Sequence, residues 1–157
     1  MTRRATFDLV VGLAVLVGAW AWVAAPSAQG SNPLVGVWEA TEETTPDGGT
    51  MLSNVGGIAI YTAGGHYAWM RAYGTRPTYP SQAEATDAQR LAAFNTFSAN
   101  GGTYTVSGSM VTHHPSVAKN PFVSAPGAGA PQTFQIQGKT LTMTNQQGRI
   151  RKFTRGE

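Results

Sequence analysis

Residues 134–142 read FQIQGKTLT, and this stretch decides the fold class of the chain. Apolar and polar side chains alternate on both sides of Gly138-Lys139, which is the pattern of two strands joined by a two-residue turn. Since side chains of a pleated strand alternate with a period of two, the hairpin has one apolar and one polar face. The apolar face contains Phe134, Ile136, Leu141 and Met143.

The same pattern recurs outward from this hairpin along most of the chain. Short runs of β-forming residues are separated by turns that contain glycine, which adopts positive φ without steric cost. This spacing predicts an antiparallel, all-β domain. We expect strands at 34–43, 50–53, 56–62, 66–73, 102–107, 109–114, 132–137, 140–145 and 149–155.

The turns also predict which side chains share a face. A two-residue turn at Ser107-Gly108 places Tyr104 beside His113, with Val106 and Val111. A two-residue turn at Gly64-Gly65 gives one face made of Ile58, Ile60, Thr62, Tyr67, Trp69 and Arg71.

The turn at 146–148 leaves two alternatives. A three-residue turn brings Arg149, Arg151 and Phe153 onto the apolar face of the preceding strand. A two-residue turn replaces them with Ile150 and Lys152.

One segment, 82–98, is rich in Ala, Gln, Leu and Phe and predicts a helix. Capping boxes are possible at Ser81 and Thr86, and Asn100-Gly101-Gly102 is a stop signal. We expect this helix to lie against the sheet through a stripe formed by Leu91, Phe94 and Phe97.

Composition excludes several classes of protein. Charged residues make up 12% of the chain, against about 25% in ordinary soluble domains, which excludes a coiled coil. A net charge of +3 with 10% aromatic residues is not that of a disordered chain, and it argues against nucleic-acid binding. No cysteine is present, so no disulfide framework is expected.

Residues 1–28 have the features of an export signal. Arg3 and Arg4 precede an apolar stretch at 9–25, and small residues ending at Ala28 offer a cleavage site. We expect an exported protein, periplasmic or secreted, whose mature domain is 29–157. The alternative is an uncleaved segment that anchors the chain in a membrane.

Eight or nine antiparallel strands with one apolar face each must close into a barrel or stack as two sheets. Consecutive tight hairpins favour an up-and-down barrel, and about eight strands enclose room for side chains or one small ligand. We therefore predict an all-β, antiparallel up-and-down barrel with one inserted helix.

Several motifs in order along the chain resemble the bacterial and fungal lipocalin-like domain family, of calycin-type barrels. They are Gly36-x-Trp38, Thr45-Pro46-Asp47-Gly48, 61–67, Arg71, Arg76-Pro77, the helix at 85–94, 102–106, 111–114 and 134–142. The resemblance implies that Gly36 and Trp38 form the barrel floor. It also implies that a late arginine, Arg151 or alternatively Arg149, stacks on the tryptophan.

We expect the cavity to bind a small, mostly apolar molecule. The predicted ligand-binding residues are Ile60, Tyr67, Trp69, Arg71, Tyr104, His113, Phe134 and Met143. Arg71 and His113 would be its polar contacts.

Two other functions remain open from the sequence. An isomerase or cyclase acting on a hydrophobic carbonyl compound would use His113 as acid or base, with Tyr67 or Arg71 stabilising an oxyanion. A barrel filled by side chains would serve only as an interaction module. The sequence contains no cofactor motif, and the adjacent His113 and His114 point to opposite faces, so neither a cofactor nor a metal is expected. It does not indicate the oligomeric state.

Overall fold

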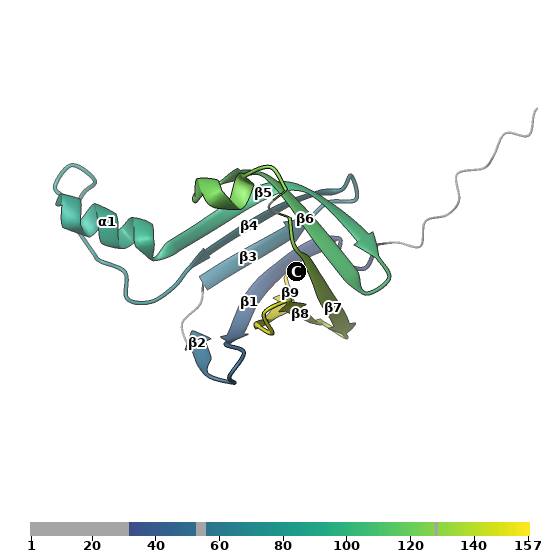
Figure 1. The fold of residues 1–157 in the computed structure, drawn as a ribbon. Helices are drawn as coiled ribbons and strands as arrows, with labels where there is room; N and C mark the ends of the chain where they lie inside the picture. The colour runs from purple at the N-terminus through teal and green to yellow at the C-terminus, as the bar shows by residue number, and fades with distance from the viewer. Residues whose placement is uncertain (1–31, 53–55, 128) are drawn as a thin grey trace, which may run out of the picture.

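The structure, a computed structural model, describes residues 32–52, 56–127 and 129–157, so the predicted export signal at 1–28 lies outside the described residues. These residues form nine strands and two short helices (Figure 1). The elements are β1 (Gly36–Thr44), β2 (Thr50–Leu52), β3 (Gly56–Tyr61), β4 (His66–Ala72), α1 (Asp87–Asn95), β5 (Phe97–Ser107), β6 (Met110–Ala118), η1 (Pro121–Ser124), β7 (Pro131–Gln137), β8 (Thr140–Asn145) and β9 (Ile150–Arg155).

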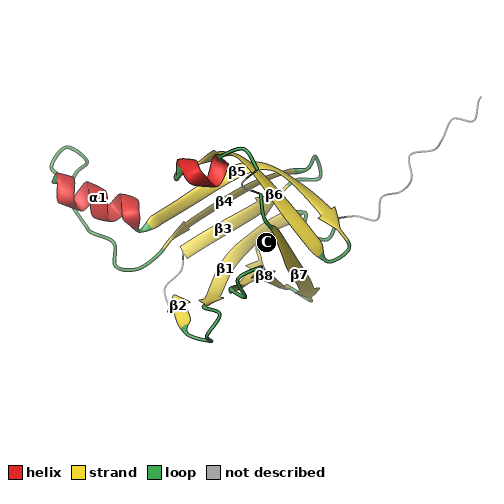
Figure 2. Ribbon diagram, in the orientation of Figure 1, coloured by secondary structure: helices red, strands yellow, loops and turns green. Residues whose placement is uncertain are grey.

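The sheet closes on itself into an eight-stranded barrel. Each strand from β3 to β9 pairs antiparallel with the next, and β1 pairs with both β3 and β9. β2 is a short extra strand on β1. The predicted up-and-down barrel with one inserted α-helix is confirmed, and the strands dominate the ribbon in Figure 2.

Two predicted hairpins have the expected register, and a third matches one of its two alternatives. Tyr104 pairs with His113 across the turn at Ser107-Gly108, and Phe134 pairs with Met143 across Gly138-Lys139. At 146–148 the three-residue alternative is correct, because Arg151 lies opposite Met143.

The predicted register of the β3–β4 hairpin is wrong by one residue. Tyr61 pairs with Tyr67 and Ala59 with Trp69, so the turn contains three residues rather than two. Gly65 adopts a φ of 78° there, a conformation that favours glycine. The extra turn residue moves Ile60 to the outer face and turns Ala59 and Tyr61 inward.

The helix also differs from its prediction. It begins after Thr86, where a capping box with Gln89 is present, but it ends at Asn95, and the segment from Phe97 is already strand β5. It does not lie against the sheet: α1 projects beyond the ends of β4 and β5 (Figure 1), and Leu91 is 60% exposed.

One end of the barrel is closed by the segment before β1. Trp38 is fully buried and its indole donates to the carbonyl of Leu34 at 2.7 Å. The cation that stacks on Trp38 is Arg155, 4.1 Å from the ring centre, and not Arg151 or Arg149. The reason is register, because Trp38 lies opposite Arg155 in the β1–β9 ladder.

Gly36 has its predicted place in this floor. Its φ is 136°, and a Cβ there would lie 2.7 Å from the Arg155 guanidinium. The same guanidinium donates to the carbonyls of Val35 and Pro33 at 2.9 Å each. Gly36, Trp38 and Arg155 therefore hold the N-terminal segment across the barrel end.

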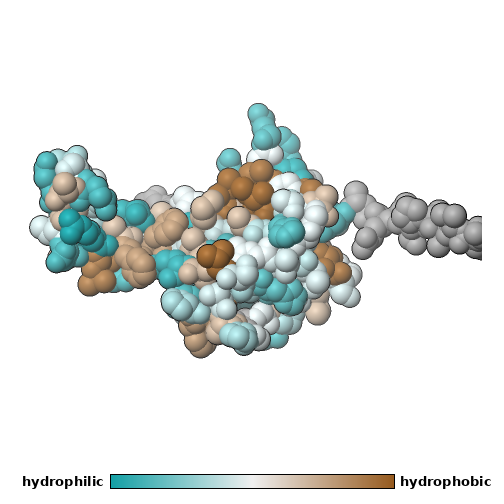
Figure 3. Space-filling view, turned by 90° about the horizontal axis from the view of Figure 1, so that it is seen from above, coloured by the Kyte–Doolittle hydropathy of each residue, from teal (hydrophilic) through white to brown (hydrophobic). Residues whose placement is uncertain are grey.

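Some hydrophobic side chains lie on the outer surface. Val117 at the end of β6 and Phe122 in η1 are largely exposed. Figure 3 shows hydrophobic groups on the upper face of the barrel, in the region of η1. None of the helices in the described ranges is long and apolar enough to cross a membrane.

Candidate functional site

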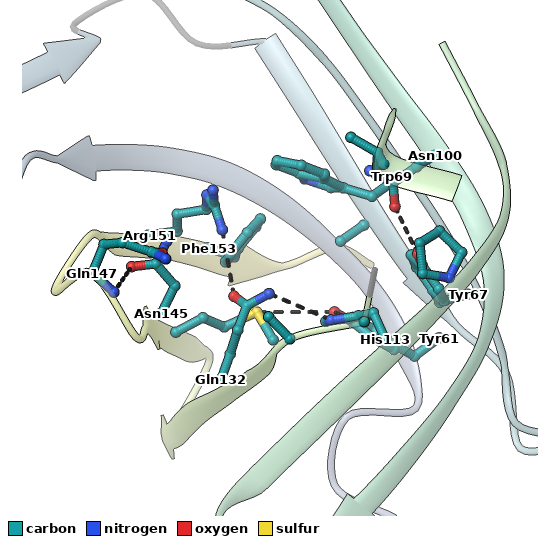
Figure 4. A pocket seen from close by; sticks show the side chains of 16 residues that line it. Tyr61, Tyr67, Trp69, Asn100, His113, Gln132, Asn145, Gln147, Arg151 and Phe153 are labelled. Carbon is teal, nitrogen blue, oxygen red and sulfur yellow. Dashed lines mark hydrogen bonds between the residues drawn. The ribbon is translucent and has the colours of Figure 1, made fainter. Parts of the chain in front are cut away.

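A cavity of about 210 Å³ lies in the barrel interior, toward the end opposite Trp38. β6 and β7 pair only at Met110–Thr112 and then separate. Residues of β6, η1, 129–130 and β7 border the cavity at this gap. Figure 4 shows the side chains that line the cavity. The lining residues are Ala59, Tyr61, Tyr67, Trp69, Asn100, His113, Pro115, Val123, Gly129, Ala130, Gln132, Met143, Asn145, Gln147, Arg151 and Phe153.

The size of the cavity limits what fits inside it. Pockets for drug-sized ligands span about 300–1,000 Å³, whereas an apolar cavity of about 150 Å³ accepts benzene. At about 210 Å³, this cavity matches a molecule of roughly one ring with a short substituent.

Aromatic rings form the wall nearest the closed end. Tyr61 meets Tyr104 edge-on at 5.1 Å between ring centres, and Tyr67 meets His113 edge-on at 4.5 Å. The Tyr67 hydroxyl donates to Asn100 at 2.7 Å, and burial raises the pKa of Tyr67 to about 12. Burial, reinforced by Tyr67 and Tyr104, also raises the pKa of Tyr61. Both phenols are therefore neutral at physiological pH.

A chain of hydrogen bonds crosses the cavity from Arg151 to Met143 (Figure 4). Arg151 donates to Oε1 of Gln132 at 3.4 Å, and the Gln132 amide lies 3.5 Å from Nδ1 of His113. Nε2 of His113 is 2.8 Å from the Tyr61 hydroxyl, which donates to the Met143 sulfur at 3.9 Å. The link between His113 and Tyr61 is the shortest of the four.

The hydrogen bonds of this chain determine which ring nitrogen of His113 carries the proton. Arg151 can only donate, so Gln132 turns its oxygen to Arg151 and its NH₂ group to Nδ1. The proton then lies on Nε2 and is donated to the Tyr61 oxygen. Burial, together with the charge of Arg151, lowers the pKa of His113 to about 4, so the imidazole is neutral at pH 7.

A carboxylate that the sequence analysis did not select lies next to this chain. Glu43 is 1% exposed and contacts three guanidinium groups. Arg71 contacts Oε2, Arg149 donates to Oε1 at 3.4 Å, and the Nε of Arg151 lies 3.4 Å from Oε1 without making a hydrogen bond. One negative charge thus faces three positive charges.

Glu43 faces inward because of a bulge in β1. Ala40 pairs with Phe153 and Glu42 with Lys152, so Thr41 is an extra residue in the ladder. Simple alternation from Trp38 would turn Glu42 inward. The bulge instead directs Glu43 into the barrel, directly opposite Arg151.

Burial and the excess of positive charge both act on the arginines of this cluster. Burial and the neighbouring guanidinium groups lower the pKa of Arg71 and of Arg151 to about 10 each, so both remain charged at pH 7. Arg151 lies 4.9 Å from the centre of the Trp69 ring, a favourable cation–π geometry. The indole N–H of Trp69 and the Nε–H of Arg151 are buried without a hydrogen-bond acceptor in the described part of the chain.

Half of the predicted ligand-binding residues line the cavity. Tyr67, Trp69, His113 and Met143 do so. Ile60, Arg71, Tyr104 and Phe134 are not among the lining residues.

Different features account for the four exceptions. Ile60 is on the outer face, and Arg71 contacts Glu43 beside the cavity. Phe134 is part of the packed core, and the Tyr104 hydroxyl is held near the closed end by the carbonyl of Thr62 and the amide of Asn32.

Some lining residues that were not selected had a signal in the sequence. Gln132 precedes Phe134 by two positions, and Asn145 follows Met143 by two, so alternation places both on inner faces. Tyr61 requires the three-residue turn at Gly65. Glu43 requires the bulge at Thr41, for which the sequence carries no signal that we recognise.

Comparison with known proteins identifies one family and several similar structures, two of which are described below. The family model described as a lipocalin-like domain matches residues 35–154. Among curated proteins none matches.

The structure is similar to that of a lipocalin-like protein from Bacteroides uniformis ATCC 8492. The TM-score is 0.50 at 12% sequence identity, over 78% of this chain and 98% of that one. An uncharacterized protein from Bacteroides eggerthii DSM 20697 gives a TM-score of 0.46 at 10% identity, over 78% and 99% of the two chains.

Proposed function

Since this chain belongs to the lipocalin-like domain family, we propose that it binds a small, mostly apolar molecule in its barrel cavity. The observation that carries the proposal is the cavity of about 210 Å³, lined by aromatic rings and opening where β6 and β7 separate. A barrel that served only as a packed module would have no need of this space.

The lining suits a ligand with an apolar body and few polar atoms. Tyr61, Tyr67, Trp69, Met143 and Phe153 offer apolar surface on several sides of the cavity. Polar groups from Asn100, Gln132, Asn145 and Arg151 lie among them. Such an arrangement of apolar walls with a small number of polar contacts is typical of small-molecule sites.

The alternative of an acid–base enzyme receives less support from the same site. A catalytic base needs an accessible lone pair and a pKa near the working pH. His113 has its Nδ1 lone pair occupied by Gln132 and a pKa of about 4, and Tyr67 donates its proton to Asn100. Arg71 is turned toward Glu43.

Export of the protein remains part of the proposal and rests on residues 1–28 of the sequence. The mature chain would begin at Gln29 and function outside the cytoplasm. N-terminal sequencing of the protein recovered from its native host tests this point. A start at Gln29 or close to it supports export, whereas an intact N-terminus on cytoplasmic protein contradicts it.

The binding proposal is tested by native mass spectrometry of protein purified from its own host. We expect a second species heavier than the chain by the mass of one small molecule. Ala59→Phe fills the cavity from β3, because Ala59 is a buried lining residue, and the bound mass should disappear.

The matched control is Ala63→Phe, at an exposed turn position outside the cavity lining, which should keep the bound mass. Thermal unfolding of both variants establishes that each is folded. A bound mass that persists in folded Ala59→Phe contradicts binding in this cavity.

A further inference from the structure

The charges beside the cavity do not balance. Arg71, Arg149 and Arg151 surround Glu43, which leaves an excess of two positive charges in this cluster. The nearby Lys152 pairs with Glu42 instead, at 3.0 Å. Among the described residues that line the cavity, Arg151 alone carries a charge at neutral pH.

The three arginines do not interact equally with the carboxylate of Glu43. Arg71 forms an ion pair with Oε2 of Glu43 and Arg149 donates to Oε1, whereas Arg151 makes no hydrogen bond to the carboxylate. The hydrogen bond that Arg151 does make is a long one, 3.4 Å, to the neutral amide of Gln132. Arg151 therefore retains donors for another acceptor.

A second donor without an acceptor lies beside Arg151, on Trp69, which also lines the cavity. The ring of Trp69 packs against the Arg151 guanidinium, and its indole N–H has no acceptor in the described part of the chain. Figure 4 shows Trp69 and Arg151 facing each other across the space, with Gln132 below them. Two neighbouring N–H donors, one of them charged, are complementary to a group with two acceptor oxygens.

We propose that the ligand is a small monocarboxylate, whose apolar part lies among Tyr61, Tyr67 and Met143 and whose carboxylate accepts hydrogen bonds from Arg151 and Trp69. This inference rests on the proposed function and specifies its ligand. A carboxylate would neutralise part of the excess positive charge and supply the missing acceptor. The cavity volume of about 210 Å³ selects acids of about one ring over long-chain acids.

The test compares benzoate with benzamide, which have the same shape and differ in charge. Each is titrated into the protein while the Trp69 indole N–H signal is followed by NMR. We expect benzoate to bind at least about tenfold more tightly, because hydrogen bonds between charged groups are about twice as strong as neutral ones. The Trp69 signal should shift with benzoate.

Arg151→Met removes the charge while keeping an unbranched side chain. We expect the preference for benzoate to disappear in this variant. Benzamide affinity should change only about threefold or less, because the neutral amide loses at most one hydrogen bond of small net free energy. Arg151→Lys keeps the charge and should retain part of the preference. Arg149→Gln is the matched control, because Arg149 belongs to the same charge cluster but does not line the cavity.

Each negative outcome has a distinct meaning. Equal affinities for benzoate and benzamide in the unmodified protein contradict the carboxylate inference and leave cavity binding intact. A preference that survives Arg151→Met, or that is lost equally in Arg149→Gln, contradicts the role of Arg151. Failure of both probes to bind contradicts the proposed function, and the inference falls with it.

Discussion

At the scale of single residues, two arginines of β9 have different tasks although they are four positions apart. Arg155 lies over Trp38 and donates to two backbone carbonyls, so it closes the barrel floor. Arg151 lies over Trp69 beside the cavity. The resemblance to lipocalin-like domains implied that a late arginine stacks on Trp38, but only the strand register decides which one.

The role of Arg155 predicts a loss of stability on truncation. Arg155→Ala removes a cation–π contact worth about 0.5–2 kcal/mol and two hydrogen bonds. We expect the free energy of unfolding, measured by denaturant titration, to fall by about 1.5–5 kcal/mol, the sum of the cation–π contact and two hydrogen bonds of about 0.5–1.5 kcal/mol each. Lys152→Ala breaks a partly exposed ion pair with Glu42 and should cost less than about 1 kcal/mol. Equal losses in the two variants would refute this assignment.

The buried His113 predicts a pH dependence of stability. The folded protein keeps this imidazole neutral down to about pH 4, whereas the unfolded chain protonates it near the ordinary pKa of about 6.5. Protons therefore favour the unfolded state, and the contribution of His113 to stability falls as pH drops from about 6.5 to about 4. The loss is at most about 3.5 kcal/mol, since the two pKa values differ by about 2.5 units and one unit corresponds to about 1.4 kcal/mol.

His113→Asn removes the titrating group, so its free energy of unfolding should change less over this pH range. The difference between the wild-type and variant curves isolates the histidine from the carboxylates, which titrate in both proteins. Parallel curves between pH 4 and 6.5 would show that His113 is not held neutral in the fold.

At the scale of elements, the turn between β3 and β4 tests the corrected register. Gly65 has a φ of 78°, whereas the φ of Gly64 is not positive. Gly65→Ala should lower the free energy of unfolding by about 1 kcal/mol, the cost of a left-handed conformation for a residue with a Cβ. Gly64→Ala should be nearly neutral. The two-residue turn expected from the sequence needs positive φ at Gly64 in both of its common forms, types I′ and II′, and so predicts a clear loss in Gly64→Ala.

The helix α1 contributes little to the core. None of its residues is buried, and Leu91 is exposed, so Leu91→Ser should change the free energy of unfolding by less than about 0.5 kcal/mol. Leu141→Ala, at a fully buried position of β8, should cost about 2–5 kcal/mol. A large loss in Leu91→Ser would mean that the helix packs on the barrel after all.

The same elements show which features of the fold could be predicted from the sequence and which could not. Alternation and glycine turns predicted the eight barrel strands and two hairpin registers, because these signals are local, and left the turn at 146–148 between two alternatives. A bulge at Thr41 and a third turn residue before Gly65 are decided by neighbouring strands. Each of these two features changes which side chains face inward, and so Glu43 and Tyr61 were not selected.

The prediction of a packed helix failed for a different reason. The apolar spacing of Leu91, Phe94 and Phe97 suggests one buried stripe. In the structure Phe97 already belongs to β5, which leaves only Leu91 and Phe94 on α1, both exposed. Local spacing did not reveal that β5 begins directly after the helix.

At the scale of the whole molecule, the barrel has two unlike halves. The end closed by Trp38 and Arg155 is packed with apolar side chains. The other half contains Glu43, three arginines and the cavity. The separation of β6 from β7 opens this half beside η1. A packed floor with a partly polar, open cavity is the arrangement expected of a barrel that binds one small molecule.

The most direct test of this account is NMR of the methionine methyl groups during titration with benzyl alcohol, a neutral molecule of about one ring. Met143 lines the cavity, whereas Met70 and Met110 are surface residues, 39% and 43% exposed. The account predicts a saturable shift of the Met143 methyl signal with the Met70 and Met110 signals unchanged. An unchanged Met143 signal, or equal shifts at all three methionines, would contradict it.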